Sequence, residues 1–169
     1  MKKQSAGILL YRQAEQGYEV LLAHPGGPFW ATKDAGSWSM PKGELDKDEK
    51  PLEAAKREFQ EEVGMPAPAG EYIHLGEAKQ SSGKIVHAWA CEADLNLEGF
   101  SSNMFEMEWP PKSGQTQEFP ENDKIAWVPM PEAKRKVVKG QVSFLEALAE
   151  KLGQTLDEPT SHSPQISLF

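Results

Sequence analysis

The sequence predicts a single α/β domain, and three observations lead to that prediction. The chain has 169 residues, of which 38% are hydrophobic and 26% are charged, a size and composition typical of one globular domain with a sizeable core. Several short, apolar, β-prone runs are separated by turn-forming residues. Other segments show the apolar spacing of helices. We expect the domain to span residues 1–152 and a polar, flexible tail to span residues 153–169.

The expected elements follow in order along the chain. Apolar or alternating runs predict strands at residues 5–11, 18–24, 39–41, 71–80, 85–93 and 125–130. Apolar residues at helical spacing predict helices at residues 131–138 and 141–151, in addition to an acidic helix that begins near Pro51. A Gly- and Pro-rich loop fills residues 25–37, and residues 94–119 are expected to be irregular.

The acidic helix carries the most informative pattern in the chain, GELDKDEKPLEAAKREFQEEVGM, which starts at Gly43. At 100° per residue, Glu58, Glu61 and Glu62 fall on one arc, next to the apolar arc that includes Phe59. Like charges three and four residues apart destabilise a helix unless a cation neutralises them. Oxygen ligands of this kind favour Mg²⁺, and Mn²⁺ could replace it. The alternative interpretation is an acidic helix face in contact with solvent.

The same segment resembles the Nudix box, because every fixed glycine, glutamate and arginine of that signature is present, from Gly43 to Gly64. Residues 4–150 are similar to a bacterial subgroup of nucleotide pyrophosphohydrolases within the Nudix family. The resemblance implies an α/β/α sandwich with a mixed sheet and a loop-helix-loop that carries the box. It also implies divalent-metal-dependent hydrolysis of a nucleoside diphosphate linked to another moiety.

The resemblance assigns roles to particular residues. The metal-binding and base-supplying glutamates of the family match Glu58, Glu61 and Glu62, and the pair that braces the loop against the helix matches Glu49 and Arg57. Gly43 is expected to permit a tight turn and Gly64 to end the helix in a left-handed conformation. The family draws its general base either from the box or from a later loop. The later candidates here are Glu118 and Glu121, whose alternative role is that of exposed loop acids.

Substrate contacts are expected from basic and aromatic residues in the loops. Lys42 is a candidate to offer its backbone carbonyl to a metal and its ammonium group to a phosphate. Lys33 and Lys84 are further phosphate-binding candidates, and Trp30 and Trp109 are candidates to stack on a base. Each of these residues has an ordinary alternative role, as a surface lysine or as an aromatic that anchors its loop.

Several substrate classes and one rival function are open. Nucleoside triphosphates and dinucleoside polyphosphates are the favoured substrates, although Ser81, Ser82 and Gly83 stand where diadenosine tetraphosphate hydrolases tend to carry a tyrosine. The net charge of −8 disfavours RNA or DNA as the main partner, because backbone phosphates require a basic surface. The rival function is a non-catalytic, nucleotide-sensing Nudix domain, in which box carboxylates tend to be lost.

Location and partners are expected from the rest of the chain. No signal peptide or membrane-spanning apolar run is apparent, so the cytoplasm is the expected compartment. The terminal peptide from Gln165 to Phe169, QISLF, is similar to the short motif by which bacterial repair proteins dock on the sliding clamp. The alternative is an apolar tail that packs on its own domain or on a second copy.

Overall fold

The computed structural model describes residues 3–157 and contains one mixed sheet with helices on both faces. The sheet order is β4-β5-β1-β2-β8, and β3 also pairs with β1. Strands β1 and β5 are parallel, whereas the other pairs are antiparallel. The predicted α/β/α sandwich with a mixed sheet is therefore confirmed. The strands of the sheet are β1 (Gln4–Ala14), β2 (Gly17–Pro25), β3 (Lys42–Glu44), β4 (Ile73–Lys79), β5 (Ile85–Glu92) and β8 (Asn122–Pro129).

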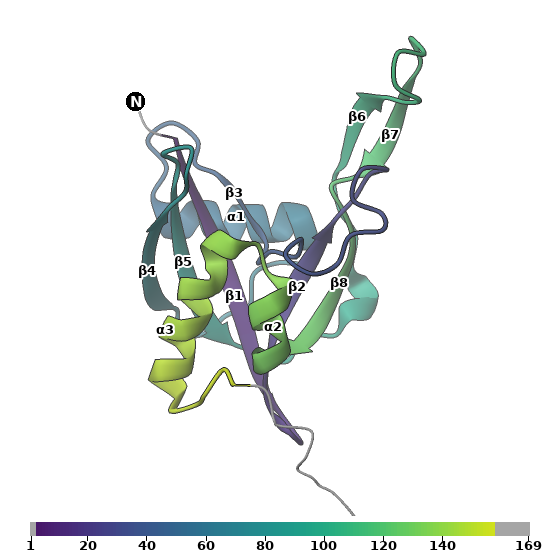
Figure 1. Ribbon diagram of the computed structural model, residues 1–169. Coiled ribbons are helices and arrows are strands. Elements are labelled where there is room, and N and C mark those ends of the chain that lie inside the picture. The colour runs from purple at the N-terminus through teal and green to yellow at the C-terminus, as the bar shows by residue number, and fades with distance from the viewer. Residues whose placement is uncertain (1–2, 158–169) are drawn as a thin grey trace, which may run out of the picture.

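Helix α1 (Pro51–Val63) covers one face of the sheet, and α2 (Met130–Lys136) and α3 (Val142–Leu152) cover the other (Figure 1). Alternate residues of β1 serve both layers: Ile8 packs in the cluster that includes Phe59 of α1, whereas Leu9 packs in the cluster that includes Phe144 of α3. A strand buried on both faces reads as a continuous apolar run, which is why residues 6–11 show little alternation. Two short 3₁₀ turns, Leu97–Gly99 and Lys139–Gln141, are the other helical elements of residues 3–157.

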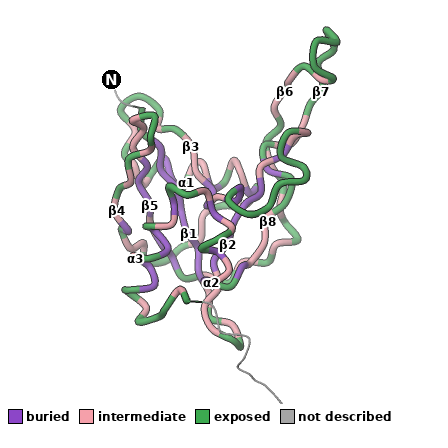
Figure 2. Tube along the Cα trace, in the orientation of Figure 1, coloured by how far each residue is buried: buried purple, intermediate pink, exposed green. Residues whose placement is uncertain are grey.

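The expectation that residues 94–119 are irregular was wrong. Strands β6 (Met104–Glu108) and β7 (Thr116–Pro120) form a separate two-stranded hairpin, which projects from the body of the molecule (Figure 1). We call this hairpin the arm. The segment of residues 26–41, which we call the β2–β3 loop, lies beside the base of the arm. Figure 2 shows that buried residues gather in the central strands, whereas the arm is exposed or half-buried.

The other differences are shifts of element ends. The expected strand at residues 39–41 is a single bridge between Ala23 and Ser39, and the strand proper begins at Lys42. Helix α2 ends at Lys136 rather than at residue 138, because Val137 is extended. Within residues 3–157 no helix is long and apolar enough to cross a membrane.

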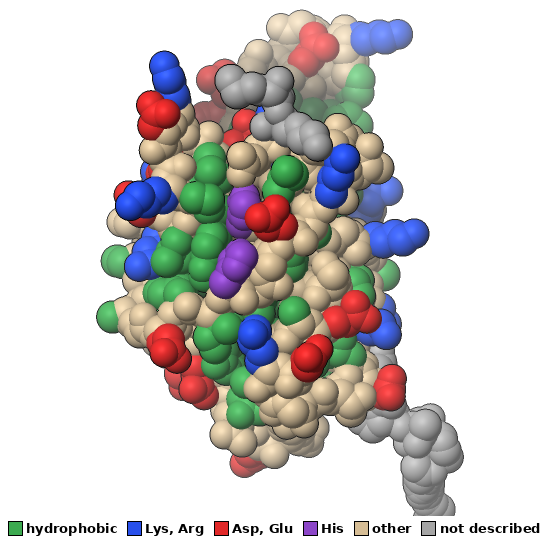
Figure 3. Space-filling model, turned by 90° about the vertical axis from the view of Figure 1, so that its left-hand side faces the viewer, with side chains coloured by type: hydrophobic (Ala, Val, Ile, Leu, Met, Phe, Trp, Pro, Cys, Tyr) green, Lys and Arg blue, Asp and Glu red, His purple; other side chains and the backbone are tan. Residues whose placement is uncertain are grey.

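The side of the molecule over edge strand β4 carries hydrophobic side chains with two histidines among them (Figure 3). On neighbouring strands β4 and β5, the rings of His74 and His87 lie 4.9 Å and 6.3 Å from the ring of Trp89, measured between centroids. His87 also forms a 2.7 Å hydrogen bond with Gln4. These two histidines therefore pack within the sheet surface.

Candidate active site

Helix α1 begins and ends as its sequence predicts. Pro51 occupies the first turn, and Gly64 adopts the left-handed conformation with a φ of 81° while its amide donates to the carbonyl of Gln60. Ala55, Phe59 and Val63 are fully buried against the sheet. Burial of this stripe fixes the rotation of the helix, so Glu58, Glu61 and Glu62 lie along the flank next to the stripe, and Glu58 and Glu62 face β3 and the start of β8.

Arg57 joins the helix to the loop that precedes it. Its Nε and Nη2 atoms each donate to one oxygen of the Glu49 carboxylate, both at 2.9 Å. Its Nη1 atom donates at 2.8 Å to Glu58 and to Glu61, and Nη2 also donates to the carbonyl of Glu44. The two-point pairing lowers the pKa of Glu49 to about 2, with the hydrogen bonds from Arg57 as the main cause. The expected brace between Glu49 and Arg57 is present in this geometry.

Glu58 lies against the backbone of Gly43. A β-carbon on Gly43 would lie 2.0 Å from the carboxyl carbon of Glu58, so any larger residue would displace the carboxylate. Gly43 is thus needed for close approach and not for the tight turn that we expected, and it lies within β3. Burial raises the pKa of Glu58 above its usual value.

Glu62 is the most strongly perturbed acid of the cluster. Its Oε1 atom accepts hydrogen bonds from the amide of Lys42 at 3.3 Å and from Nδ2 of Asn122 at 3.2 Å. Burial nevertheless raises the pKa of Glu62 to about 7. Asn122 begins strand β8, about 60 residues from Glu62 in the chain. Sequence reasoning missed Asn122, because no local spacing connects an asparagine at a strand start with a distant helix.

The two later glutamates occupy different places. Glu121 lies at the base of the arm, where its amide donates to Asn103 and its carbonyl accepts from Gly26. Burial, and then the charge of Glu61, raise the pKa of Glu121. Glu118 is exposed within β7, opposite Glu106 of β6. Within the described part of the chain, the electrostatic neighbours of the α1 cluster include Glu121 and not Glu118.

A pocket of about 340 Å³ opens beside Glu62. Its lining brings together residues from the loop, the helix and the sheet: Ala23, Pro25, Trp30, Ser37, Ser39, Lys42, Glu62, Gln80, Asn122 and Val138. Trp30 and Lys42, both expected from the sequence, thus lie in one cavity with Glu62. Burial lowers the pKa of Lys42. Gln80 was missed because its place depends on the packing of the β4–β5 turn.

The remaining substrate-binding candidates lie outside the lining of this pocket. The Nζ atom of Lys84 lies 3.7 Å from Oε2 of Glu44, the residue after Gly43. The backbone carbonyl of Lys33 accepts a hydrogen bond from Nε2 of His24, so this residue has a structural contact through its main chain. Trp109 lies on the arm, with its ring 5.5 Å from the ring of Phe29.

The carboxylates fit a divalent cation by their chemistry. Glu58, Glu61 and Glu62 offer hard oxygen ligands on one side of α1, and the raised pKa values of Glu58 and Glu62 show that their charges are not fully compensated. Glu58 and Glu61 turn toward Arg57, and within residues 3–157 no three acidic, histidine or cysteine side chains stand in ligating positions. Arg57 contacts Oε2 of Glu58 and Oε2 of Glu61, so ligation of a cation through their Oε1 atoms is compatible with both Arg57 contacts.

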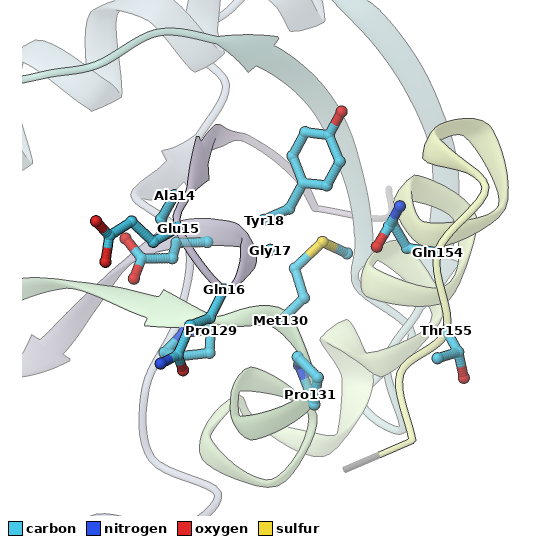
Figure 4. Close-up of a pocket in the computed structure, with 11 residues that line it drawn as sticks. Ala14, Glu15, Gln16, Gly17, Tyr18, Pro129, Met130, Pro131, Gln154 and Thr155 are labelled. Carbon is cyan, nitrogen blue, oxygen red and sulfur yellow. The ribbon is translucent and has the colours of Figure 1, made fainter. Parts of the chain in front are cut away.

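A second pocket, of about 460 Å³, lies at the other end of strands β1 and β2. Its wall is formed by the β1–β2 turn, the start of α2 and the residues after α3, and Met130 points into the space between Tyr18 and Gln154 (Figure 4). Its lining shares no residue with the acidic cluster, so the pocket beside Glu62 is the one that can hold a substrate next to the carboxylates.

Comparisons with known proteins agree with this geometry. A family model described as the NUDIX domain matches residues 1–148. An RNA pyrophosphohydrolase of Mesorhizobium japonicum is 31% identical over 156 residues, which cover 76% of this chain and 80% of that protein. An RNA pyrophosphohydrolase of Hahella chejuensis is 45% identical over 56 residues, which cover 32% of this chain and only 35% of that protein.

A structural comparison gives the same fold. The crystal structure of an Ap4A hydrolase binary complex of C. elegans matches with a TM-score of 0.62 at 20% identity, over 88% of this chain and 98% of that one. At this identity the likeness shows the fold alone. The family model, the Mesorhizobium relative and the arrangement of Glu49, Arg57 and the α1 glutamates together show that the chain belongs to the NUDIX domain family, the Nudix hydrolases that act on pyrophosphate bonds.

Proposed function

We propose that the protein hydrolyses the pyrophosphate bond of a nucleoside diphosphate linked to another moiety, with Mg²⁺ or Mn²⁺ as cofactor. Nucleoside triphosphates and dinucleoside polyphosphates are the favoured substrates. The observation that carries the proposal is the placement of Glu62 in the wall of a pocket that also contains Lys42 and Trp30. One cavity thus joins a carboxylate of the acidic cluster, a lysine and an aromatic ring, which are groups suited to a metal ion, a phosphate and a base, respectively.

Each residue of the candidate active site has its own role in the proposed reaction. A divalent cation held by Glu58, Glu61 and Glu62 would, when bound, neutralise pyrophosphate charge and acidify a water molecule. Lys42 lines the same cavity, where its ammonium group would meet a phosphate oxygen of the substrate. Arg57 holds Glu58 and Glu61 in place through Nη1 while Glu49 fixes the guanidinium. Asn122 orients the carboxylate of Glu62 through its amide group.

The proton acceptor is a glutamate, and two positions are candidates. Glu61 belongs to the helix, and Glu121 reaches the cluster from the base of the arm. Glutamine variants separate them when both are assayed at saturating metal, because loss of the base still lowers kcat strongly there, whereas weaker metal binding is offset by the higher metal concentration. Glu118 is the control for this comparison, since it is exposed on the arm.

The function is tested with Glu61→Ala/Glu62→Ala and a matched control, Glu53→Ala, an exposed glutamate in the first turn of the same helix. We expect the double variant to lose roughly 1,000-fold or more in turnover while keeping its circular dichroism spectrum, and the control to match the parent protein. Near-normal hydrolysis by the double variant would remove the assignment. Absence of hydrolysis in the parent protein, with retained nucleotide binding, would favour the nucleotide-sensing alternative.

The substrate panel contains triphosphates, dinucleoside polyphosphates, nucleotide sugars, diphosphoinositols and 5′-triphosphorylated RNA, with products identified by mass. RNA is included because the Mesorhizobium relative is named an RNA pyrophosphohydrolase. The cytoplasm stays the expected compartment. Docking of Gln165 to Phe169 on a sliding clamp also stays a prediction, since these residues lie outside the described part of the chain. Failure of the full chain to bind a bacterial clamp would exclude it.

A further inference from the structure

The arm has one aromatic face and one acidic face. Phe105 and Met107 of β6 and Trp109, the residue after it, are half-buried, whereas the residues between them are exposed. The exposed positions include Glu106 and Glu108, and Glu106 lies opposite Glu118 of β7. Because side chains alternate across a strand, the aromatic residues share the face on which Phe105 lies opposite Phe119.

The aromatic face is turned toward the β2–β3 loop. A β-carbon on Gly27 would lie 3.0 Å from the ring of Phe105, so this glycine allows the loop to approach the arm. Further along, the rings of Phe29 and Trp109 meet edge to face at 83°, with 5.5 Å between their centroids. Trp30, the next residue of the loop, lines the pocket beside Glu62. We call Trp30, Phe29 and Trp109 the aromatic row, because Trp30 lines the pocket and its neighbour in the loop, Phe29, contacts Trp109 of the arm.

The row is exposed where a ligand could reach it. Phe29 is 59% exposed and Trp30 is 43% exposed, and both are among the few large apolar side chains left open in the described part of the chain. Pairs of aromatic rings that remain open to solvent next to a substrate pocket suit stacking with a flat, uncharged ring system.

Hydrogen bonds connect the base of the arm to residues beside the acidic cluster. At its base, the amide of Glu121 donates to Asn103 at 2.7 Å, and the amide of Asn122 donates to Ser102 Oγ at 3.0 Å. At its tip, Glu108 accepts from the amides of Lys112 and Gly114, which closes the turn. The position of Trp109 is thereby linked to Asn122, the partner of Glu62.

The charge of the arm limits what the aromatic row can accept. Residues 103–121 carry four carboxylates and a single lysine. Such a segment repels the backbone phosphates of an RNA chain, whose binding requires basic side chains. It does not repel a neutral nucleoside. The occupant that suits aromatic rings on an acidic arm is thus a base at the far end of a short polyphosphate.

We propose that Phe29 and Trp109 form a second base-binding subsite, which takes the distal nucleoside of a dinucleoside polyphosphate whose other nucleoside lies in the pocket beside Trp30. The proposal rests on the proposed hydrolase function and names its substrate class. It assigns a role to the arm, which lies outside the Nudix box.

The test compares diadenosine tetraphosphate with adenosine 5′-tetraphosphate, which has the same number of phosphates and no second nucleoside. KM is measured with magnesium, and Kd is measured by calorimetry with calcium in place of magnesium, in the full chain. We expect both KM and Kd of the parent protein to be about tenfold lower for the dinucleotide than for adenosine 5′-tetraphosphate, a ratio in the range that one stacked base contributes. In Trp109→Ala and Phe29→Ala this ratio falls to about one, and Trp109→Phe restores most of it.

The matched control is Met104→Ala, an exposed apolar residue on the opposite face of the same strand, which keeps the ratio of the parent protein. A ratio near one in the parent protein, or a ratio that Trp109→Ala does not change, overturns the subsite. Tighter binding of 5′-triphosphorylated RNA than of the dinucleotide, lost in Trp109→Ala, overturns the choice of occupant. A protein that binds the dinucleotide with the expected ratio but hydrolyses nothing contradicts the hydrolase function and leaves the subsite in place.

Discussion

Glu62 illustrates how a single buried acid connects stability with function. Its pKa of about 7 in the folded protein lies above the ordinary glutamate value of 4.5, mainly because of burial. The folded state therefore holds the proton more tightly than the unfolded state between these two pH values. In the absence of metal, this residue destabilises the fold progressively as the pH rises from 4.5 to 7. A bound cation would offset that cost, since it favours the ionised form.

We expect Glu62→Gln to stabilise the metal-free protein at pH 8 by about 1 to 3 kcal/mol, and to have little effect at pH 4. The amide oxygen of glutamine can still accept from Lys42 and Asn122, so the comparison isolates the charge. Urea unfolding with EDTA at both pH values measures the difference. Equal stabilisation at pH 4 and pH 8 would show that the effect does not come from ionisation of this side chain.

The pairing of Arg57 with Glu49 gives the stability of the fold a pH dependence opposite to that caused by Glu62. The pKa of Glu49 is held at about 2, so its contribution to stability is present above pH 4.5 and is lost as the pH falls toward 2. Arg57→Lys keeps the charge but loses the planar fork, and a lysine cannot serve Glu49, Glu58 and Glu61 together. We expect lower stability and a strong fall in kcat, measured by thermal unfolding and by substrate turnover.

Arg12→Lys is the matched control for that variant. Arg12 also pairs with two acids, Glu19 and Asp94, but at a site away from the α1 cluster. We expect a small loss of stability and normal turnover. If Arg57→Lys and Arg12→Lys had the same effect on kcat, the bracing role of Arg57 would be wrong.

At the scale of elements, the sequence predicts what depends on strong local patterns. The central strands, α1 and α3 each carry a long apolar stripe, and the residues that start and end α1, Pro51 and Gly64, act locally. The arm was missed because its alternation runs for only five residues in β6, includes the exposed Met104, and leads into a turn with two prolines. A hairpin outside the core has no large buried face to reveal it in the sequence.

In the candidate active site, too, the sequence predicts the residues placed by local patterns and misses those placed by long-range packing. The glutamates of α1 and the Glu49–Arg57 pair lie within 14 residues of one another, so helical geometry and the Nudix box place them together. Asn122, Gln80 and the contact between Phe29 and Trp109 depend on long-range packing. Their chemistry is visible in the sequence, but their neighbours are set by the sheet topology.

The β2–β3 loop is fixed by a histidine that no motif identified. His24 is buried at the end of β2, where Nδ1 forms a 2.8 Å hydrogen bond with Asp123 of β8 and Nε2 donates to the carbonyl of Lys33. We expect His24→Ala to loosen the loop and to raise KM more than it lowers kcat, because Trp30 lies in that loop. Hydrogen exchange of residues 33–38 and steady-state kinetics measure both effects.

His74→Ala serves as the control, since His74 is exposed on β4 and packs against Trp89. It should change neither the exchange of residues 33–38 nor KM. Unchanged loop exchange in His24→Ala would mean that other contacts, such as the hydrogen bond from Trp38 to Asp34, suffice to hold the loop.

For the whole molecule, stability and substrate recognition come from different parts of the chain. Two apolar clusters, one on each face of the sheet, contain the buried core, and neither includes a residue of the arm. The acidic cluster lies at the edge of one of them, on the flank of α1 that faces β3 and the start of β8. The arm extends from this body beside the pocket, so its shape can vary without disturbing the core, whereas the β2–β3 loop is anchored in the core by Trp38 and Met40.

Removal of the arm should therefore leave the fold intact. We expect a variant in which an Asn-Gly turn replaces residues 105–119, between the paired Met104 and Pro120, to unfold cooperatively with a Tm lowered by no more than about 5 °C. Phe144→Ala is the contrasting variant, because it opens a cavity in the fully packed core and should cost about 3 to 5 kcal/mol. Circular dichroism melts compare the two. Loss of cooperative unfolding on removal of the arm would show that the arm stabilises the body. That result would contradict the inference that we draw from the absence of arm residues in both apolar clusters.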